Sequence, residues 1–210
     1  MISGLKEDGI IEHAGRAGAP DDCVVRKAAM HDIGPILELI NGYAANGIML
    51  PRTEMEVSED IRDFSVIVTA GRLVGCGALH FYTPYIGEIR SLAVAEDAKT
   101  HGIGRRLIEA LVREASNYSL DAVFAFTYVA DFFRKMGFQE VERGELPLKA
   151  WKDCVRCPKF QCCDEIAVMR VLRPEYCRHF QRDRQFEESP LVQLPVLRAS
   201  SPTTPWNTLK

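Results

Sequence analysis

A short glycine-containing segment, AKTHGIG at residues 98–104, stands between an apolar run and a strongly helical pattern. Glycine weakens helices, so two glycines at a helix start indicate that a bare backbone is needed there. The first N–H groups of a helix have no partner within it, and together with the helix dipole they attract anions. Lys99 and Arg105 add positive charge, while a GKS or GKT ending and the GxGxxG pattern are absent. The segment predicts a phosphate-binding turn, with a purely geometric turn as the alternative.

A carboxylate and a guanidinium lie two residues apart in IGEIRSLAV (86–94), just before this turn. Side chains two positions apart in a strand point to the same face of a sheet, so Glu88 and Arg90 are expected to share one face. A carboxylate can accept a proton during a reaction, and an arginine can bind a carboxylate through two parallel hydrogen bonds. A simple ion pair between the two residues, with no catalytic role, is the alternative.

The rest of the chain must supply the elements that position these groups. Apolar residues at helical spacing predict helices at 31–47, 53–64, 103–115 and 129–136. Alternating and short apolar runs predict strands at 23–28, 86–94, 121–126, 137–143 and 164–172, and a hairpin over 65–82 that turns through TAGR. This order predicts an α/β or α+β fold with a mixed sheet.

Composition limits the classes of protein that the chain can belong to. It has 210 residues, a net charge of −3 and a pI near 6.0, which give no general affinity for nucleic acid or anionic membranes. No apolar run reaches the about 18 residues of a membrane span, and the N-terminus lacks a signal-peptide core. We therefore expect a cytoplasmic protein with a flexible segment at 1–22, one domain at 23–180 and a disordered, proline-rich tail at 181–210.

Four cysteines gather in an insertion at 149–163 before the last predicted strand. A CxxC pair is half of a common zinc site, but the second half is not standard, since two of the cysteines are adjacent and Cys177 and His179 lie beyond a strand. A redox-responsive pair and a loop of ordinary reduced thiols are the alternatives, and no metal site is assigned. The cluster consists of Cys154, Cys157, Cys162 and Cys163.

The segment SLAVAEDAKTHGIGRRLIEALVREA, followed by FFRKMGF, resembles the GNAT superfamily of acetyl-CoA-dependent N-acetyltransferases over residues 23–173. The resemblance implies a mixed, mostly antiparallel sheet, splayed after the fourth strand and flanked by helices, with the pantetheine arm of acetyl-CoA in the opening. Lysine at the first position of the diphosphate loop departs mildly from the usual arginine or glutamine. The cofactor-binding residues that the resemblance implies are Leu92, Val94, Lys99, Thr100, His101, Gly102, Ile103, Gly104 and Arg105.

Further segments, among them GCGALHFY, GEIRSLAV and IMLPRTEMEV, look like the acetyltransferase domain of N-acetylglutamate synthases in its short, stand-alone form, without the amino-acid-kinase domain of longer members. The resemblance places Arg52 and Arg90 at the carboxylates of an amino-acid substrate. An ammonium must lose a proton before it attacks, so a base is needed. Glu88 is the first candidate and His80 the second.

One position departs from the wider superfamily. Many members carry a tyrosine that protonates the leaving thiolate at the position that Phe133 occupies here, a substitution that the glutamate synthase group shares. Phenylalanine has no proton to donate, so Thr127 or Tyr128 would take this role. A backbone N–H near Val94 would stabilise the oxyanion.

These residues predict acetylation of the α-amine of L-glutamate, the first step of arginine biosynthesis. The same chemistry on L-glutamine or another amino acid is one alternative, and a non-catalytic acetyl-CoA-binding regulatory module is another. No nucleic-acid or membrane partner is expected. Dimers are common in the superfamily, so a homodimer is one assembly that the resemblance allows.

Overall fold

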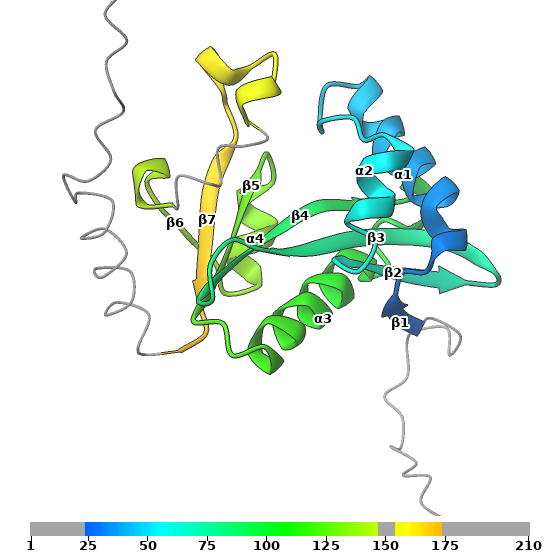
Figure 1. The fold of residues 1–210 in the computed structure, drawn as a ribbon, viewed down its shortest axis with the longest axis horizontal. Coiled ribbons are helices and arrows are strands. Elements are labelled where there is room, and N and C mark those ends of the chain that lie inside the picture. Colours follow the sequence, from blue (N-terminus) through cyan, green and yellow to red (C-terminus); the bar gives the residue numbers. More distant parts are fainter. Residues whose placement is uncertain (1–23, 147–153, 174–210) are drawn as a thin grey trace, which may run out of the picture.

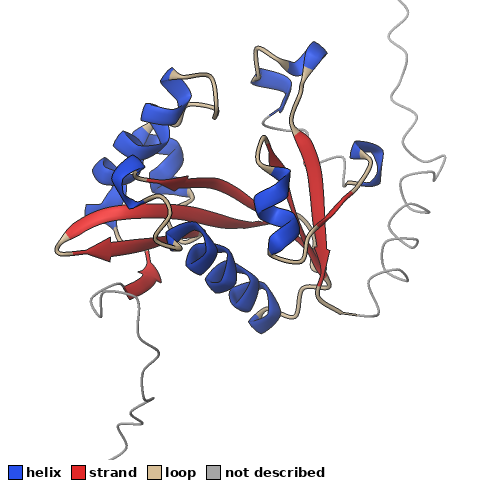
Figure 2. Cartoon of the chain, turned by 180° about the vertical axis from the view of Figure 1, so that it is seen from behind, coloured by secondary structure: helices blue, strands red, loops and turns tan. Residues whose placement is uncertain are grey.

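The computed structural model describes residues 24–146 and 154–173, which form one mixed sheet with helices on both faces (Figures 1 and 2). The predicted tails, the first part of the cysteine insertion, Cys177 and His179 lie outside these residues. The strands run in the order β1-β2-β3-β4-β5-β7-β6. They are β1 (Val24–Lys27), β2 (Phe64–Thr69), β3 (Arg72–Phe81), β4 (Ile86–Val94), β5 (Ala122–Thr127), β6 (Gln139–Glu140) and β7 (Ile166–Val171).

Four α-helices and several 3-10 turns complete the described chain. The helices are α1 (Ile33–Ala45), α2 (Glu54–Glu59), α3 (Ile103–Asn117) and α4 (Ala130–Lys135). Figure 1 shows α1 and α2 on one face of the sheet and α3 on the other. Among the described residues, no helix combines the length and apolar character needed to cross a membrane.

Each face of the sheet buries the apolar stripe of one long helix. On the α3 face, Leu107, Ile108 and Leu111 are fully buried against the sheet, as the spacing predicts. On the α1 face, Ile36 and Ile40 are buried against β2 and β3 residues such as Val66. These two layers fix β4 between them, and β4 is the strand that the predicted chemistry needs.

The sheet opens next to β4, as predicted. β4 pairs with β5 in parallel, but this pairing ends at Glu88 opposite Phe124. Beyond that point β4 continues to Val94 while β5 turns away (Figure 1). The six residues of β4 after Glu88 therefore have no pairing partner in β5.

A β-bulge changes the direction of the side chains within β4. Cys76 pairs with Ala93, but Ala78 pairs with Arg90, so β4 carries one extra residue, and Ser91 has a positive φ of 54°. Ile89 before the bulge and Leu92 after it both pack on the α3 face. Glu88 and Arg90 consequently point to the α1 face, together, as their spacing predicts.

The prediction for residues 137–143 was too long. β6 covers only Gln139–Glu140, and its ladder to β7 ends with the bond from Val141 N–H to Ala167 O. A 3-10 turn at Arg143–Glu145 then takes the chain away from the sheet. A two-residue edge strand needs no alternating pattern, so little in the sequence marks its end.

Candidate active site

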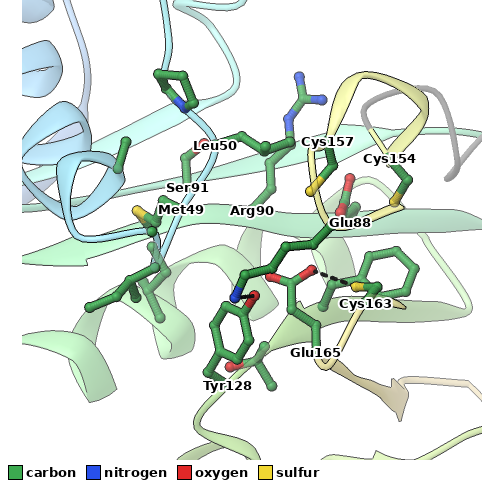
Figure 3. Close-up of a pocket in the computed structure, with 18 of the residues that line it drawn as sticks. Met49, Leu50, Glu88, Arg90, Ser91, Tyr128, Cys154, Cys157, Cys163 and Glu165 are labelled. Carbon is green, nitrogen blue, oxygen red and sulfur yellow. Dashed lines mark hydrogen bonds between the residues drawn. The ribbon is translucent and has the colours of Figure 1, made fainter. Parts of the chain in front are cut away.

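The opening of the sheet contains a pocket with a cavity volume of about 410 Å³ (Figure 3). Most of its wall comes from four parts of the chain: the loop after α1 at residues 47–52, the middle of β4, the end of β5 and the residues just after it, and the cysteine segment at 154–165. Six of the predicted site residues line it: Arg52, Glu88, Arg90, Leu92, Thr127 and Tyr128.

Glu88 is the buried acid of this pocket. Glu88 is the last β4 residue that pairs with β5, and only 8% of the residue is exposed. The Tyr82 hydroxyl donates a hydrogen bond to Glu88 Oε2 at 2.9 Å. A carboxylate fixed in this way, at the edge of a cavity, has the position that a general base requires.

Arg90 is held from the α2 side. Its Nη2 donates to Asp60 Oδ2 at 2.8 Å, and its side chain is 11% exposed. The Nη2 atom also lies 3.1 Å from Nδ1 of His80, which is 2.6 Å from Asp63 Oδ2. A carboxylate only accepts, so the shorter distance indicates that His80 Nδ1 donates to Asp63 and merely contacts Arg90.

His80 is therefore a weaker candidate for the base. The pocket lining does not include it, and one of its ring nitrogens is engaged by Asp63. Asp60, Asp63 and His80 also place three potential metal ligands within 4.8 Å of one another. Because the Arg90 guanidinium already lies among them, its positive charge opposes a bound cation at this place.

Arg52 enters the pocket on a fixed loop. Its backbone N–H donates to Asn41 Oδ1 at 2.9 Å, and its backbone carbonyl accepts from Asn41 Nδ2 at 3.0 Å. This pair of bonds ties the loop to α1. The capping box of Thr53 and Glu56 then starts α2 directly after Arg52, so the chain is also fixed on that side of the arginine.

Both predicted hydroxyl groups lie at the pocket end of β5. Thr127 is buried, and its Oγ1 accepts from Val129 N–H at 3.0 Å. Tyr128 is more exposed, and Lys159 Nζ donates to its hydroxyl at 3.1 Å. Burial is the main cause that raises the pKa of Tyr128, which keeps the phenol protonated at neutral pH. Phe133 also lines the pocket, consistent with its having no proton-donating role.

The glycine turn adopts the conformation that its sequence predicts. Thr100 and Gly102 both have left-handed backbone angles, with φ of 73° and 75°, and Gly102 is the N-cap of the fifteen-residue helix α3. At position 104 glycine is favoured by limited space, because a Cβ there would lie 3.3 Å from the Phe132 ring. Lys99 bonds Glu96 at 2.5 Å, and this hydrogen bond is the main cause that raises its pKa.

The turn and the pocket lie at the two ends of one stretch of β4. Among the predicted cofactor residues, Leu92 reaches the pocket, whereas Val94 and residues 99–105 do not line it. The Val94 carbonyl accepts from the Tyr43 hydroxyl at 2.6 Å. Arg105 Nε bonds Glu109 at 2.8 Å and is largely exposed at the start of α3.

The sequence did not reveal the wall opposite β4. Cys154, Cys157 and Cys163 line the pocket together with Glu165 and Lys159. The cysteines were visible as a cluster, but their distance along the chain from Glu88 concealed this placement. In Figure 3, Glu165 points toward Cys163, whose Sγ donates to Glu165 Oε2 at 3.8 Å. Burial is the main cause that raises the pKa of Glu165.

Arg143 is a further cation at this wall that the sequence did not single out. It lines the pocket, its Nη2 lies 3.1 Å from Cys163 Sγ, and the same atom bonds the Glu165 carbonyl. The pocket thus contains basic residues from separate parts of the chain beside two acids. Such a lining suits a ligand with both carboxylate and ammonium groups.

Comparison with known proteins agrees with this fold. A family model described as acetyltransferase (GNAT) domain matches residues 60–140. An uncharacterised N-acetyltransferase of Chlorobaculum tepidum is 44% identical over 154 residues, which are 73% of this chain and 99% of that protein. An amino-acid acetyltransferase of Mycobacterium tuberculosis is 37% identical over 142 residues, 65% of this chain and 81% of that protein.

Two solved structures are similar as well. One is N-acetylglutamate synthase of Neisseria gonorrhoeae in complex with coenzyme A and N-acetyl-glutamate, with a TM-score of 0.66 and 29% identity over 72% of this chain and 35% of that one. The other is Rv2747 of Mycobacterium tuberculosis in complex with CoA, with a TM-score of 0.63 and 29% identity over 71% of this chain and 99% of that one. This chain thus spans about a third of the gonococcal synthase.

The opened sheet, the αL turn at the start of α3 and the pocket between them define an N-acetyltransferase fold. The chain belongs to the GNAT acetyltransferase family. Several of its relatives carry the name amino-acid acetyltransferase.

Proposed function

We propose that this protein transfers the acetyl group of acetyl-CoA to the α-amine of L-glutamate. The observation that carries this proposal is the placement of Glu88 and Arg90 side by side in one pocket at the opening of the sheet. Named relatives are amino-acid acetyltransferases, and the gonococcal synthase was solved with coenzyme A and N-acetyl-glutamate.

Acetyl-CoA is the acetyl donor. Its diphosphate binds the N–H groups at the start of α3, where Thr100 and Gly102 hold the backbone in left-handed angles. Its pantetheine arm lies along β4 after Glu88, where β5 no longer pairs and backbone groups can bond it as an added strand would. The acetyl group then reaches the pocket near Leu92.

The acceptor lies in the pocket with its carboxylates toward Arg52 and Arg90. Glu88 takes the proton of the ammonium, directly or through one water, and the free amine attacks the thioester carbonyl. A backbone N–H near Val94 stabilises the oxyanion, and the leaving thiolate takes a proton from Tyr128 or Thr127. Arg143 and Lys159 add positive charge for the side-chain carboxylate of the acceptor.

The test is release of free CoA from acetyl-CoA in the presence of L-glutamate, L-glutamine, L-aspartate, L-ornithine or L-lysine, each in a separate reaction. Turnover should be fastest with L-glutamate. Glu88→Gln should lower kcat by about 10²–10⁴-fold. Arg90→Ala should raise the acceptor KM by about 10–100-fold, since a charge-assisted contact contributes about 1.5–3 kcal/mol.

Arg113→Ala is the matched control, because Arg113 is exposed on α3 outside the pocket lining. Fastest turnover with L-glutamine would retain the chemistry and refute the glutamate assignment. Binding of acetyl-CoA without any acceptor-dependent CoA release would refute the enzymatic proposal and favour a regulatory acetyl-CoA-binding module.

A further inference from the structure

Three thiols that the proposed reaction does not use form part of the pocket wall. Cys154, Cys157 and Cys163 all line the pocket, and each is a free, partly buried thiol. Cys162, between them in sequence, is exposed instead. The segment therefore directs three of its four thiols at the place where we expect the acceptor amino acid to bind.

Cys154 and Cys157 lie at the two ends of one 3-10 turn. The Cys157 N–H donates to the Cys154 carbonyl at 2.9 Å, which closes the turn. Three residues at a rise of about 2.0 Å, making one full turn, bring the two Cα atoms about 6 Å apart and align their side chains. Disulfides need a Cα separation of about 4.4–6.8 Å, so the backbone can accept a bond between these residues.

The two side chains also point the same way. Figure 3 shows both sulfur atoms leaving the turn toward the pocket and Glu88, whereas the Cys163 sulfur is directed at Glu165. Cys163 is held there by its contacts to Arg143 and Glu165. Among the described cysteines, the pair best placed to react is therefore Cys154 and Cys157.

We propose that Cys154 and Cys157 are an oxidation site, and that a reversible disulfide between them weakens binding of the acceptor in the pocket. The oxidant is a hydroperoxide, with hydrogen peroxide as the simplest case. The effect on the acceptor rests on the proposed function, whereas formation of the disulfide does not.

The reaction balances over two steps. The Cys157 thiolate attacks one peroxide oxygen, the O–O bond breaks, and a sulfenic acid and one water form. The Cys154 sulfur then attacks the sulfenic sulfur, so that the S–S bond forms, the S–O bond breaks and a second water leaves. One peroxide is reduced to two waters by the two electrons and two protons of the thiols.

The order of the two thiols follows from their surroundings. Burial, and then the neighbouring Cys163, Glu165 and Glu88, raise the pKa of Cys154 to about 11. A thiol that is protonated at neutral pH is a poor first nucleophile toward a peroxide, because the thiolate is the reactive form. In the proposed reaction we therefore assign Cys154 as the resolving thiol.

The disulfide would act on one substrate only. Forming the bond moves both sulfur atoms toward each other and removes two S–H groups from the wall that faces Glu88. The turn at residues 99–105, where we place the diphosphate, is not part of this wall, and the thiols lie on the wall opposite Leu92, where we place the acetyl group, so the binding of acetyl-CoA should not change. We expect the acceptor KM of the oxidised protein to rise at least threefold, with kcat within twofold and the affinity for acetyl-CoA unchanged.

The test treats the reduced full chain with hydrogen peroxide, maps its disulfides by differential alkylation and mass spectrometry, and measures both KM values before and after dithiothreitol. We expect a Cys154–Cys157 disulfide in the native chain and in Cys162→Ser and Cys163→Ser. It should be absent in Cys154→Ser and Cys157→Ser, whose acceptor KM should no longer respond to peroxide. Thermal melting of these two variants confirms that they fold.

Several outcomes would overturn the proposal. A disulfide that instead includes Cys162 or Cys163 would refute the assigned pair, as would thiols protected by a bound metal that elemental analysis detects. A Cys154–Cys157 disulfide with an acceptor KM changed less than threefold would refute its effect on binding. The mapping needs no turnover, so a failure of the proposed enzymatic function is distinguishable from a failure of the oxidation site.

Discussion

The ion pair of Arg90 and Asp60 gives a quantitative test of how the acceptor pocket is built. Arg90 Nη2 donates to Asp60 Oδ2 at 2.8 Å, and the two side chains are 11% and 31% exposed. Asp60 follows the last residue of α2, so it anchors the arginine to an element outside the sheet. We expect Asp60 to act as a positioning residue that orients the guanidinium toward the acceptor.

The expected effect of removing Asp60 follows from the exposure of these two side chains. A buried hydrogen bond between charged groups contributes about 1.5–3 kcal/mol, and solvent at Asp60 reduces this to about 1–1.5 kcal/mol. A difference of about 1.4 kcal/mol is tenfold in an equilibrium constant, so Asp60→Ala should raise the acceptor KM about fivefold to tenfold. In the proposed reaction, Arg90 would bind the acceptor equally in the ground and transition states, so kcat should change less than twofold.

Steady-state release of CoA at varied acceptor concentration measures both constants. Asp60→Asn keeps an oxygen that can accept from Arg90 and should have a smaller effect, about twofold to threefold. Glu59→Ala removes an exposed carboxylate from the same helix and is the matched control. A lower acceptor KM in Asp60→Ala would refute the reasoning, because Asp60 would then compete with the acceptor for Arg90 rather than orient it.

Three further predictions concern the thiolate acid, the anion site and the stability of the fold. Tyr128→Phe should lower kcat at least tenfold. Thr127→Val should lower it less than threefold, because the threonine hydroxyl is buried and bonded to the backbone. The reverse order of effects would make Thr127 the acid that protonates the thiolate. Gly102→Ala places a side chain at a φ of 75° and should raise the acetyl-CoA KM several-fold, measured beside the acceptor KM, which should not move. Asp32→Asn removes a buried carboxylate whose pKa is lowered by its hydrogen bonds with Arg26. The free energy of unfolding in urea should therefore fall by about 1–2 kcal/mol at pH 7, and this loss should shrink as the pH falls below about 4. An equal loss at pH 3 would contradict this role.

The elements whose signals are local were predictable from the sequence. The stripe on α3 and the turn before it each depend on residues within one or two helical turns, and both were predicted correctly. The shared face of Glu88 and Arg90 also followed from strand periodicity alone. The bulge at Ser91 was not predictable, since no special residue marks it and only the pairing of β4 with β3 reveals it.

The far wall of the pocket could not be predicted, because tertiary packing alone brings it to β4. Cys154 and Glu165 lie more than sixty residues after Glu88 and reach it only because β7 returns beside β5. The partner of Arg90 was hidden for the same reason, since Asp60 lies thirty residues earlier. Glutamate and aspartate are common on protein surfaces, so the residue types alone did not show that Glu165 and Asp60 lie at the pocket.

In the proposed reaction, the bulge would let one strand contact both substrates. Before Ser91, β4 directs Glu88 and Arg90 to the α1 face, where the acceptor pocket lies. After Ser91, the extra residue reverses the alternation, and Leu92 turns to the α3 face and its core. In the proposed complex, the side chains of Glu88 and Arg90 would thus face the acceptor, while the later β4 backbone, which β5 does not pair, would face acetyl-CoA. Without the bulge, Cys76 would pair with Leu92 instead of Ala93, and the β4 side chains after residue 90 would point to the opposite face from the one that they now occupy.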